Sequence, residues 1–134
     1  MKANIERVVG LGFEYVGDWL LSNNSLQYSL SHHAEERDTL YAFVSGREIK
    51  YIGKSAVTLT QRLNGYRMPG PTQKTNIRIS SLIIESLKKG MSVTIYAFVQ
   101  RHRLSYKGFP VNLAAGLENT LIKHFKPDWN MIGK

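Results

Sequence analysis

The alternation of apolar and polar residues predicts two pairs of strands in the first half of the chain. Residues 13–21 and 26–30 should form a hairpin around the polar turn at residues 22–25. Residues 40–44 and 49–52 are rich in aromatic and β-branched types and flank a second turn, which contains Gly46. A short helix is expected before the first hairpin, over residues 4–11.

The second half shows apolar residues at helical spacing instead. Helices are predicted over residues 59–66 with Thr58 as N-cap, from Thr75 or Asn76 to a stop at Gly90, and from 112 or 113 to 125. Residues 92–99 should be a third central strand. Residues 67–74 and the basic stretch 100–109 carry no period and are predicted to be loops.

This order of elements predicts an α/β fold with a small, mainly antiparallel, three-stranded central sheet flanked by helices. Residues 1–38 would be an N-terminal helix and β-hairpin extension to a module at residues 39–134. A chain of 134 residues that is 43% hydrophobic has the size of one domain, so we expect a single domain over residues 1–134.

The charge balance favours a polyanionic partner. Eighteen Lys and Arg against ten Asp and Glu give a net charge of 18 − 10 = +8, which suits nucleic acid. The positive residues are scattered rather than gathered on one amphipathic helix, which argues against a membrane surface. The N-terminal residues lack the apolar core of a signal peptide, so a cytoplasmic location is expected.

Two known sequence motifs are incomplete in this chain, and a possible metal site is disfavoured. Gly10 and Gly12 begin a dinucleotide fingerprint, but Tyr15 stands where its third glycine would be. Residues 53–55 read Gly-Lys-Ser, but Glu48 occupies the first glycine position of a P-loop. Two adjacent histidines, at 32 and 33, precede Glu35 and Glu36; because neighbouring side chains usually point apart, a polar loop is favoured there over a metal site.

The stretch from residue 40 to residue 66 holds chemistry suited to phosphodiester hydrolysis. Tyr41 and Tyr51 lie on paired strands and can meet at one water if they share a face. Lys54 would favour the phenolate and lower the tyrosine pKa. Arg62 would grip phosphate oxygens with its planar guanidinium. Each residue taken alone also has a structural reading as a packing or solvated side chain, so the assignment depends on the ordered set.

That set resembles the GIY-YIG nucleases, especially the small restriction endonucleases and the phage endonuclease II type. The resemblance spans residues 40 to 130 and rests on Leu40-Tyr41, on Tyr51-Ile52-Gly53-Lys54-Ser55, on Arg62 and Glu118, and on Pro127-Asp128-Trp129-Asn130. The glycine and isoleucine of the first motif are absent. Many relatives carry a histidine one helical turn after the arginine, where this chain has Tyr66.

The resemblance implies the GIY-YIG nuclease fold and a divalent-metal-dependent DNA endonuclease. Either Tyr41 or Tyr51 could be the general base, with Tyr41 favoured near the nucleophile. Glu118 would hold Mg²⁺, for which Mn²⁺ is a substitute, and the ion would stabilise the leaving oxygen. Tyr66 would bind phosphate or support the water, and Asn130 would orient the site or contact the DNA backbone.

DNA is expected to contact polar and basic residues on the flanking loops; these are Arg67, Gln73, Lys74, Thr75, Asn76, Arg78, Arg101, Arg103 and Lys107. For Gln73 and Asn76, helix capping is an equal alternative. His102 and His124 are read as loop and surface residues. A cutter of both strands with one site per chain would work as a homodimer or homotetramer. The alternatives are a noncatalytic nucleic-acid-binding protein and a structure-specific repair nuclease.

Overall fold

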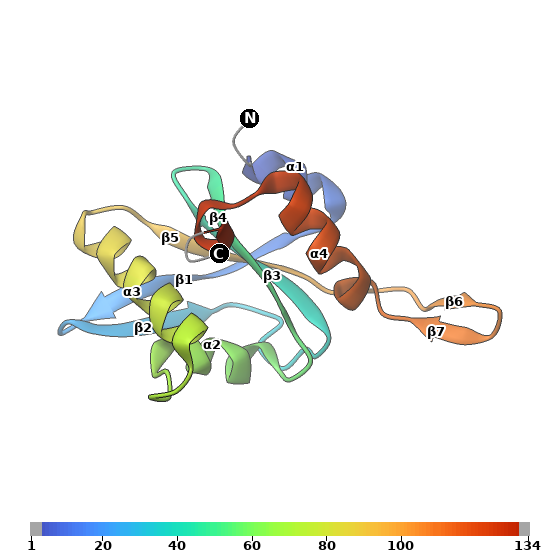
Figure 1. Ribbon diagram of the computed structural model, residues 1–134, viewed down its shortest axis with the longest axis horizontal. Coiled ribbons are helices and arrows are strands. Elements are labelled where there is room, and N and C mark those ends of the chain that lie inside the picture. The colour runs from blue at the N-terminus through green and yellow to red at the C-terminus, as the bar shows by residue number, and fades with distance from the viewer. Residues whose placement is uncertain (1–3, 132–134) are drawn as a thin grey trace.

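The computed structural model describes residues 4–131 (Figure 1). Its elements, in chain order, are α1 (Ile5–Leu11), β1 (Glu14–Ser22), β2 (Ser25–Leu30), β3 (Thr39–Ser45), β4 (Glu48–Ser55), α2 (Leu59–Arg67), α3 (Lys74–Lys88), β5 (Val93–Phe98), β6 (Leu104–Tyr106), β7 (Phe109–Val111), α4 (Leu113–Phe125) and α5 (Asp128–Met131).

The main sheet has five strands in the order β2-β1-β5-β3-β4, and every neighbouring pair is antiparallel. An antiparallel sheet flanked by helices was predicted, and this prediction is confirmed. The sheet is larger than the expected three strands because β1 pairs with β5. The N-terminal hairpin therefore continues the sheet instead of standing outside it.

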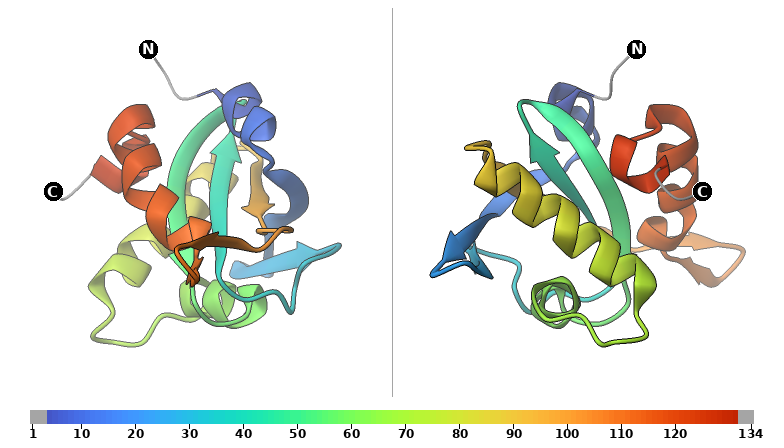
Figure 2. Two further views of the ribbon diagram at one scale, coloured as in Figure 1. Left: turned by 90° about the vertical axis from the view of Figure 1, so that its right-hand side faces the viewer. Right: turned by 60° about the vertical axis from the view of Figure 1, so that its left-hand side comes forward.

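Helices cover both faces of the sheet (Figure 2). On one face, Leu59 and Leu63 of α2 and Ile79 and Ile83 of α3 pack on the buried aromatic residues of the strands. On the other face, residues of α1 and α4 pack on Leu40 and its neighbours. Both faces of β3 are therefore covered, and every one of its residues is buried.

The N-terminus of α2 is held by its own cap and by the segment before β3. Thr58 and Gln61 form a capping box, in which the Thr58 hydroxyl accepts from the Gln61 amide. The amides of Leu59 and Thr60 donate to the carbonyls of Glu36 and Ala34, at 3.0 Å each. The free N–H groups that begin any α-helix thus find partners, and the predicted start of this helix is confirmed.

One predicted loop is wrong. The basic stretch at residues 100–109 was expected to be irregular, but β6 and β7 form a two-stranded hairpin there, which projects from the body of the molecule (Figure 1). Its turn is Lys107-Gly108, and both residues have positive φ angles, 50° and 86°, as the turns of tight hairpins require. With three residues in each strand, the hairpin is too short to show a period in the sequence.

The end of α3 follows the prediction, since Gly90 follows the C-cap with φ of 84°. The short helix α5 was not predicted. Among the described helices, none is long and apolar enough to span a membrane.

Candidate active site

A β-bulge in β4 brings the predicted tyrosines to one face of the sheet. Val44 pairs with Ile49 and Phe43 pairs with Tyr51, so Lys50 is the extra residue between these pairs. Without it, Ile49 and Tyr51 would point the same way, because side chains alternate along a strand. Instead, Ile49 packs on the α4 side and Tyr51 on the α2 side.

Three tyrosine hydroxyls meet on this face. The Tyr41 and Tyr66 oxygens are 2.6 Å apart, and the Tyr66 hydroxyl donates to Tyr51 at 3.4 Å. If Tyr66 donates to Tyr51, then Tyr41 must donate to Tyr66, since each phenol has a single proton. Tyr41 and Tyr66 are fully buried, whereas Tyr51 is 7% exposed. Tyr51 thus stands at the outer end of the chain of hydroxyls.

Arg62 joins the two inner tyrosines. Its Nε donates to the Tyr41 hydroxyl at 2.9 Å, and its terminal nitrogen donates to the Tyr66 hydroxyl at 3.0 Å. The guanidinium carbon also lies 4.9 Å from the centre of the Tyr66 ring, a cation–π distance. Arg62 and Tyr66 are one helical turn apart on α2, so the helix itself sets this arrangement.

The expected lowering of a tyrosine pKa is wrong. Burial raises the pKa of Tyr41, of Tyr51 and of Tyr66 above the ordinary value of 10.0, and the charge of a neighbouring phenol raises each further; Arg62 opposes this rise only in part. Lys54 does not offset this. It is exposed and lies opposite Leu40, whose side chain is on the α4 face of the sheet. All three phenols are therefore protonated at neutral pH.

Glu118 lies on α4 and is half-buried. Its negative charge contributes to raising the pKa of Tyr51, behind the larger effects of burial and Tyr66. Of the three tyrosines, Tyr51 is therefore the one on which the Glu118 charge acts. An oxygen donor so placed fits the chemistry of Mg²⁺, which takes one or two protein carboxylates and completes its shell with water and substrate phosphate.

Asn130 bonds to the backbone of the strand that carries Tyr51. Its side-chain oxygen accepts from the Ile52 amide at 2.8 Å, and its side-chain nitrogen donates to the Ile52 carbonyl at 2.9 Å. Since β4 is an edge strand, these two bonds replace a missing neighbour strand. The side chain is only 6% exposed, so its geometry favours an orienting role over contact with DNA.

The residues predicted to bind DNA fall into three groups. Lys74, Thr75, Arg103 and Lys107 are exposed, and Arg67 is half-exposed beside Asn64. Asn76 is only 8% exposed and donates to Gln73, which also accepts from the Gly70 amide; this favours packing over base contact. Arg78 donates to the Trp129 carbonyl at 2.7 Å, and Arg101 pairs with Glu14.

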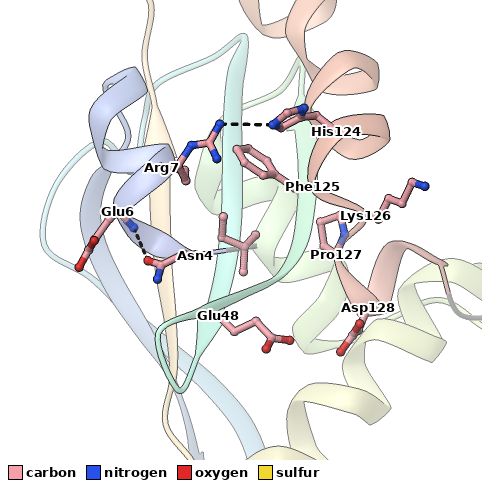
Figure 3. A pocket seen from close by; sticks show the side chains of 10 residues that line it. Asn4, Glu6, Arg7, Glu48, His124, Phe125, Lys126, Pro127 and Asp128 are labelled. Carbon is pink, nitrogen blue, oxygen red and sulfur yellow. Dashed lines mark hydrogen bonds between the residues drawn. The ribbon is translucent and has the colours of Figure 1, made fainter. Parts of the chain in front are cut away.

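A pocket of about 710 Å³ lies elsewhere, between α1, the start of β4 and the end of α4. Figure 3 shows Arg7 pointing to His124 across it, with Glu48 and Asp128 on the opposite side. Both signs of charge line the pocket, and none of the three clustered tyrosines does. Its lining therefore gives no support for placing the chemistry there.

Gly53 is a site residue that the sequence reasoning did not single out. A Cβ on this residue would lie 2.5 Å from the Tyr41 ring carbon that carries the hydroxyl. Because Gly53 has no Cβ, the Tyr41 ring can lie over it and bring its hydroxyl to Arg62. Its position in the Tyr51-Ile52-Gly53 motif was the available signal.

The fold is that of the GIY-YIG nucleases, as the sequence resemblance implied. The structure of the E118A mutant of bacteriophage T4 EndoII shares 28% sequence identity with this chain at a TM-score of 0.73, over 96% of this chain and 98% of that one. Restriction endonuclease HPY188I, solved with product DNA, has 17% identity and a TM-score of 0.58, over 96% of this chain and 83% of its own. No protein-family model and no curated protein sequence matches the chain.

Proposed function

We propose that the protein is a divalent-metal-dependent DNA endonuclease that hydrolyses phosphodiester bonds in one step. The observation that carries the proposal is the orientation of Arg62 between Tyr41 and Tyr66, with Glu118 in electrostatic reach of Tyr51. The similarity to T4 EndoII along nearly the whole of both chains supports the same chemistry.

Arg62 is suited to bind the scissile phosphate. Two of its N–H groups are committed to the tyrosine hydroxyls, and the others remain available to phosphate oxygens. Because burial and two hydrogen bonds fix the guanidinium in place, its charge is oriented before substrate arrives. Such preorganised charge is worth more in a partly buried site than in water.

Tyr51 is the tyrosine that we assign to the attacking water. Its side chain is the most exposed of the three, and its hydroxyl stands at the outer end of the row of phenols. A neutral phenol in this position donates to or accepts from a water and holds it in line with the phosphate. Tyr41, buried against Gly53, positions Arg62 instead. This reverses the preference for Tyr41 near the nucleophile.

Glu118 is the residue that we expect to hold Mg²⁺ or Mn²⁺. A metal ion bound there would supply positive charge to the departing oxygen. The exposed lysines and arginines of the α2–α3 region and of the β6–β7 hairpin would supply salt-dependent contacts to the DNA backbone. A cutter of both strands would bring two such sites together in a homodimer or homotetramer.

Incubation of plasmid DNA with the protein and Mg²⁺ tests the proposal. Nicked or linear product is expected, and EDTA, Glu118→Gln or Arg62→Ala should each abolish it. Cleavage that persists in both variants would refute the site assignment. DNA binding without cleavage across Mg²⁺, Mn²⁺ and Co²⁺ would indicate a noncatalytic nucleic-acid-binding protein. Duplex, single-stranded and branched substrates, compared side by side, separate a restriction-like role from a structure-specific repair role.

A further inference from the structure

Two adjacent histidines and a glutamate converge on one point at the open end of the β1–β2 hairpin. Glu14 begins β1, and His32 and His33 follow the end of β2. The Glu14 Oε2 lies 3.1 Å from His33 Nε2 and 3.7 Å from His32 Nε2. The ligand atoms of all three side chains lie within 4.8 Å of one another. The expectation that neighbouring histidines point apart is wrong here.

The backbone explains why the two rings meet. His33 has φ of +66°, in the left-handed region, where the usual alternation of side chains along an extended chain is broken. The ring centres of His32 and His33 are consequently 5.0 Å apart. Such a conformation costs free energy in a residue other than glycine, and it is found where the surrounding structure requires it.

Ser31 holds the His32 ring in place. The Ser31 hydroxyl lies 3.1 Å from the Val16 carbonyl oxygen and 2.7 Å from His32 Nδ1. The ring therefore turns its other nitrogen, Nε2, towards Glu14. A hydrogen bond of this kind, on the far nitrogen of the ring, is how proteins orient metal-binding histidines.

We propose that Glu14, His32 and His33 form a zinc site, distinct from the catalytic carboxylate Glu118. The ligands would be the two Nε2 atoms and the Oε2 of Glu14. Two imidazoles and a carboxylate are a known zinc donor set, with a further position filled by water. Mg²⁺ prefers oxygen donors and is disfavoured here. Small side-chain rotations would bring the three atoms to the bonding distances of about 2.0–2.2 Å that zinc requires.

Arg101 also contacts the Glu14 carboxylate, but through a different oxygen from the one that the histidines face. It pairs with Glu14 Oε1, whereas both histidines face Oε2. Its positive charge opposes a cation at the site, so it weakens zinc binding while it holds the carboxylate in position. This predicts opposite effects for substitutions of Arg101 and of the ligands.

The site is connected to the candidate active site through the backbone. Directly after His33, the carbonyls of Ala34 and Glu36 accept hydrogen bonds from the first turn of α2, the helix that carries Arg62 and Tyr66. A metal ion that binds the histidines would therefore also hold in place the two carbonyls that accept from the first turn of α2. Zinc should therefore raise the melting temperature of the protein as well as bind it.

Zinc titration of untagged, chelator-treated protein, followed by competition with a chromophoric zinc indicator, tests the proposal. One zinc ion per chain is expected at micromolar concentration. His33→Ala, His32→Ala and Glu14→Gln should each weaken binding at least about tenfold and remove the zinc-dependent rise in Tm. Arg101→Gln should bind zinc as tightly or more tightly.

Two controls separate this site from others. His124→Ala removes an exposed histidine from α4, and Glu118→Gln removes the proposed catalytic ligand; zinc affinity should be unchanged in both. His32 is 45% exposed, so its substitution tests the site even if His33→Ala fails to fold. Absence of zinc binding, or equal affinity in His32→Ala and the unaltered protein, would overturn the proposal. Loss of binding in Glu118→Gln alone would assign the zinc to the catalytic site.

Discussion

The ring of Tyr41 on β3 occupies the space where a Cβ atom at Gly53 on β4 would lie. The two residues are direct cross-strand partners. Side chains of such partners lie on the same face of a sheet, about 4.5–5.5 Å apart at their Cβ atoms. With no Cβ at residue 53, the phenol extends across β4 and reaches Arg62 and Tyr66.

Gly53→Ala should disrupt this arrangement. The new methyl group would meet the Tyr41 ring carbons at 2.5 and 2.9 Å, and the ring is fully buried and has little room to retreat. We expect a loss of about 1–3 kcal/mol in the free energy of unfolding, as for other overpacked cores, together with loss of cleavage. Urea denaturation and the plasmid assay measure the two effects. Gly10→Ala, in α1 with no atom within 4 Å of the new carbon, is the matched control and should retain both properties.

The sequence predicted the elements around this contact better than the contact itself. Hydrophobic spacing identified β3, β4 and α2, and the Thr58 cap identified where α2 begins. These features are local, because each depends on residues a few positions apart. The resemblance to GIY-YIG nucleases then grouped Arg62 with the tyrosines, and the structure brings these side chains together.

Other features depend on contacts between distant residues, which no local pattern reveals. The bulge at Lys50 decides which face of the sheet Tyr51 takes. Lys54 is three positions beyond Tyr51 on the same strand, so its side chain lies on the opposite face and does not lower the pKa of a tyrosine. The bonds from Asn130 to Ile52 join residues 78 positions apart. The convergence of His32 and His33 required a left-handed backbone that their residue types do not specify.

Asn130→Ala should loosen the edge of the sheet next to Tyr51. Removal of the side chain would leave the amide and carbonyl of Ile52 without their partners, and we expect a loss of about 2–4 kcal/mol in the free energy of unfolding. Hydrogen exchange at the Ile52 amide should accelerate more than exchange elsewhere in β4. Asn119→Ala, at an exposed position on α4, should change neither. Unaltered exchange at Ile52 would show that the two bonds do not hold the edge.

The buried phenols predict a loss of stability at alkaline pH. The pKa of Tyr41, Tyr51 and Tyr66 is raised in the folded protein above the ordinary value of 10.0. Their contribution to stability is therefore complete below about pH 10 and is lost as the pH rises above it, since unfolded tyrosines release their protons first. Urea denaturation at a series of pH values should show this decline. It should be shallower in Tyr41→Phe, and an equal slope in both proteins would contradict the burial of an ionisable phenol.

Arg62→Lys tests whether catalysis needs the shape of the guanidinium or only its charge. Lysine keeps the positive charge. The guanidinium of Arg62 donates to the Tyr41 and Tyr66 hydroxyls at 2.9 and 3.0 Å and has further N–H groups left for a phosphate. A single ammonium cannot make all of these contacts at once. We expect cleavage to fall by about 10²–10³-fold while DNA binding, measured by gel shift, falls much less. Arg47→Lys, at an exposed turn away from the tyrosines, is the control and should cleave normally. Equal cleavage by Arg62→Lys and the unaltered protein would mean that Arg62 acts only as a point charge, and the two-tyrosine orientation would then have no catalytic role.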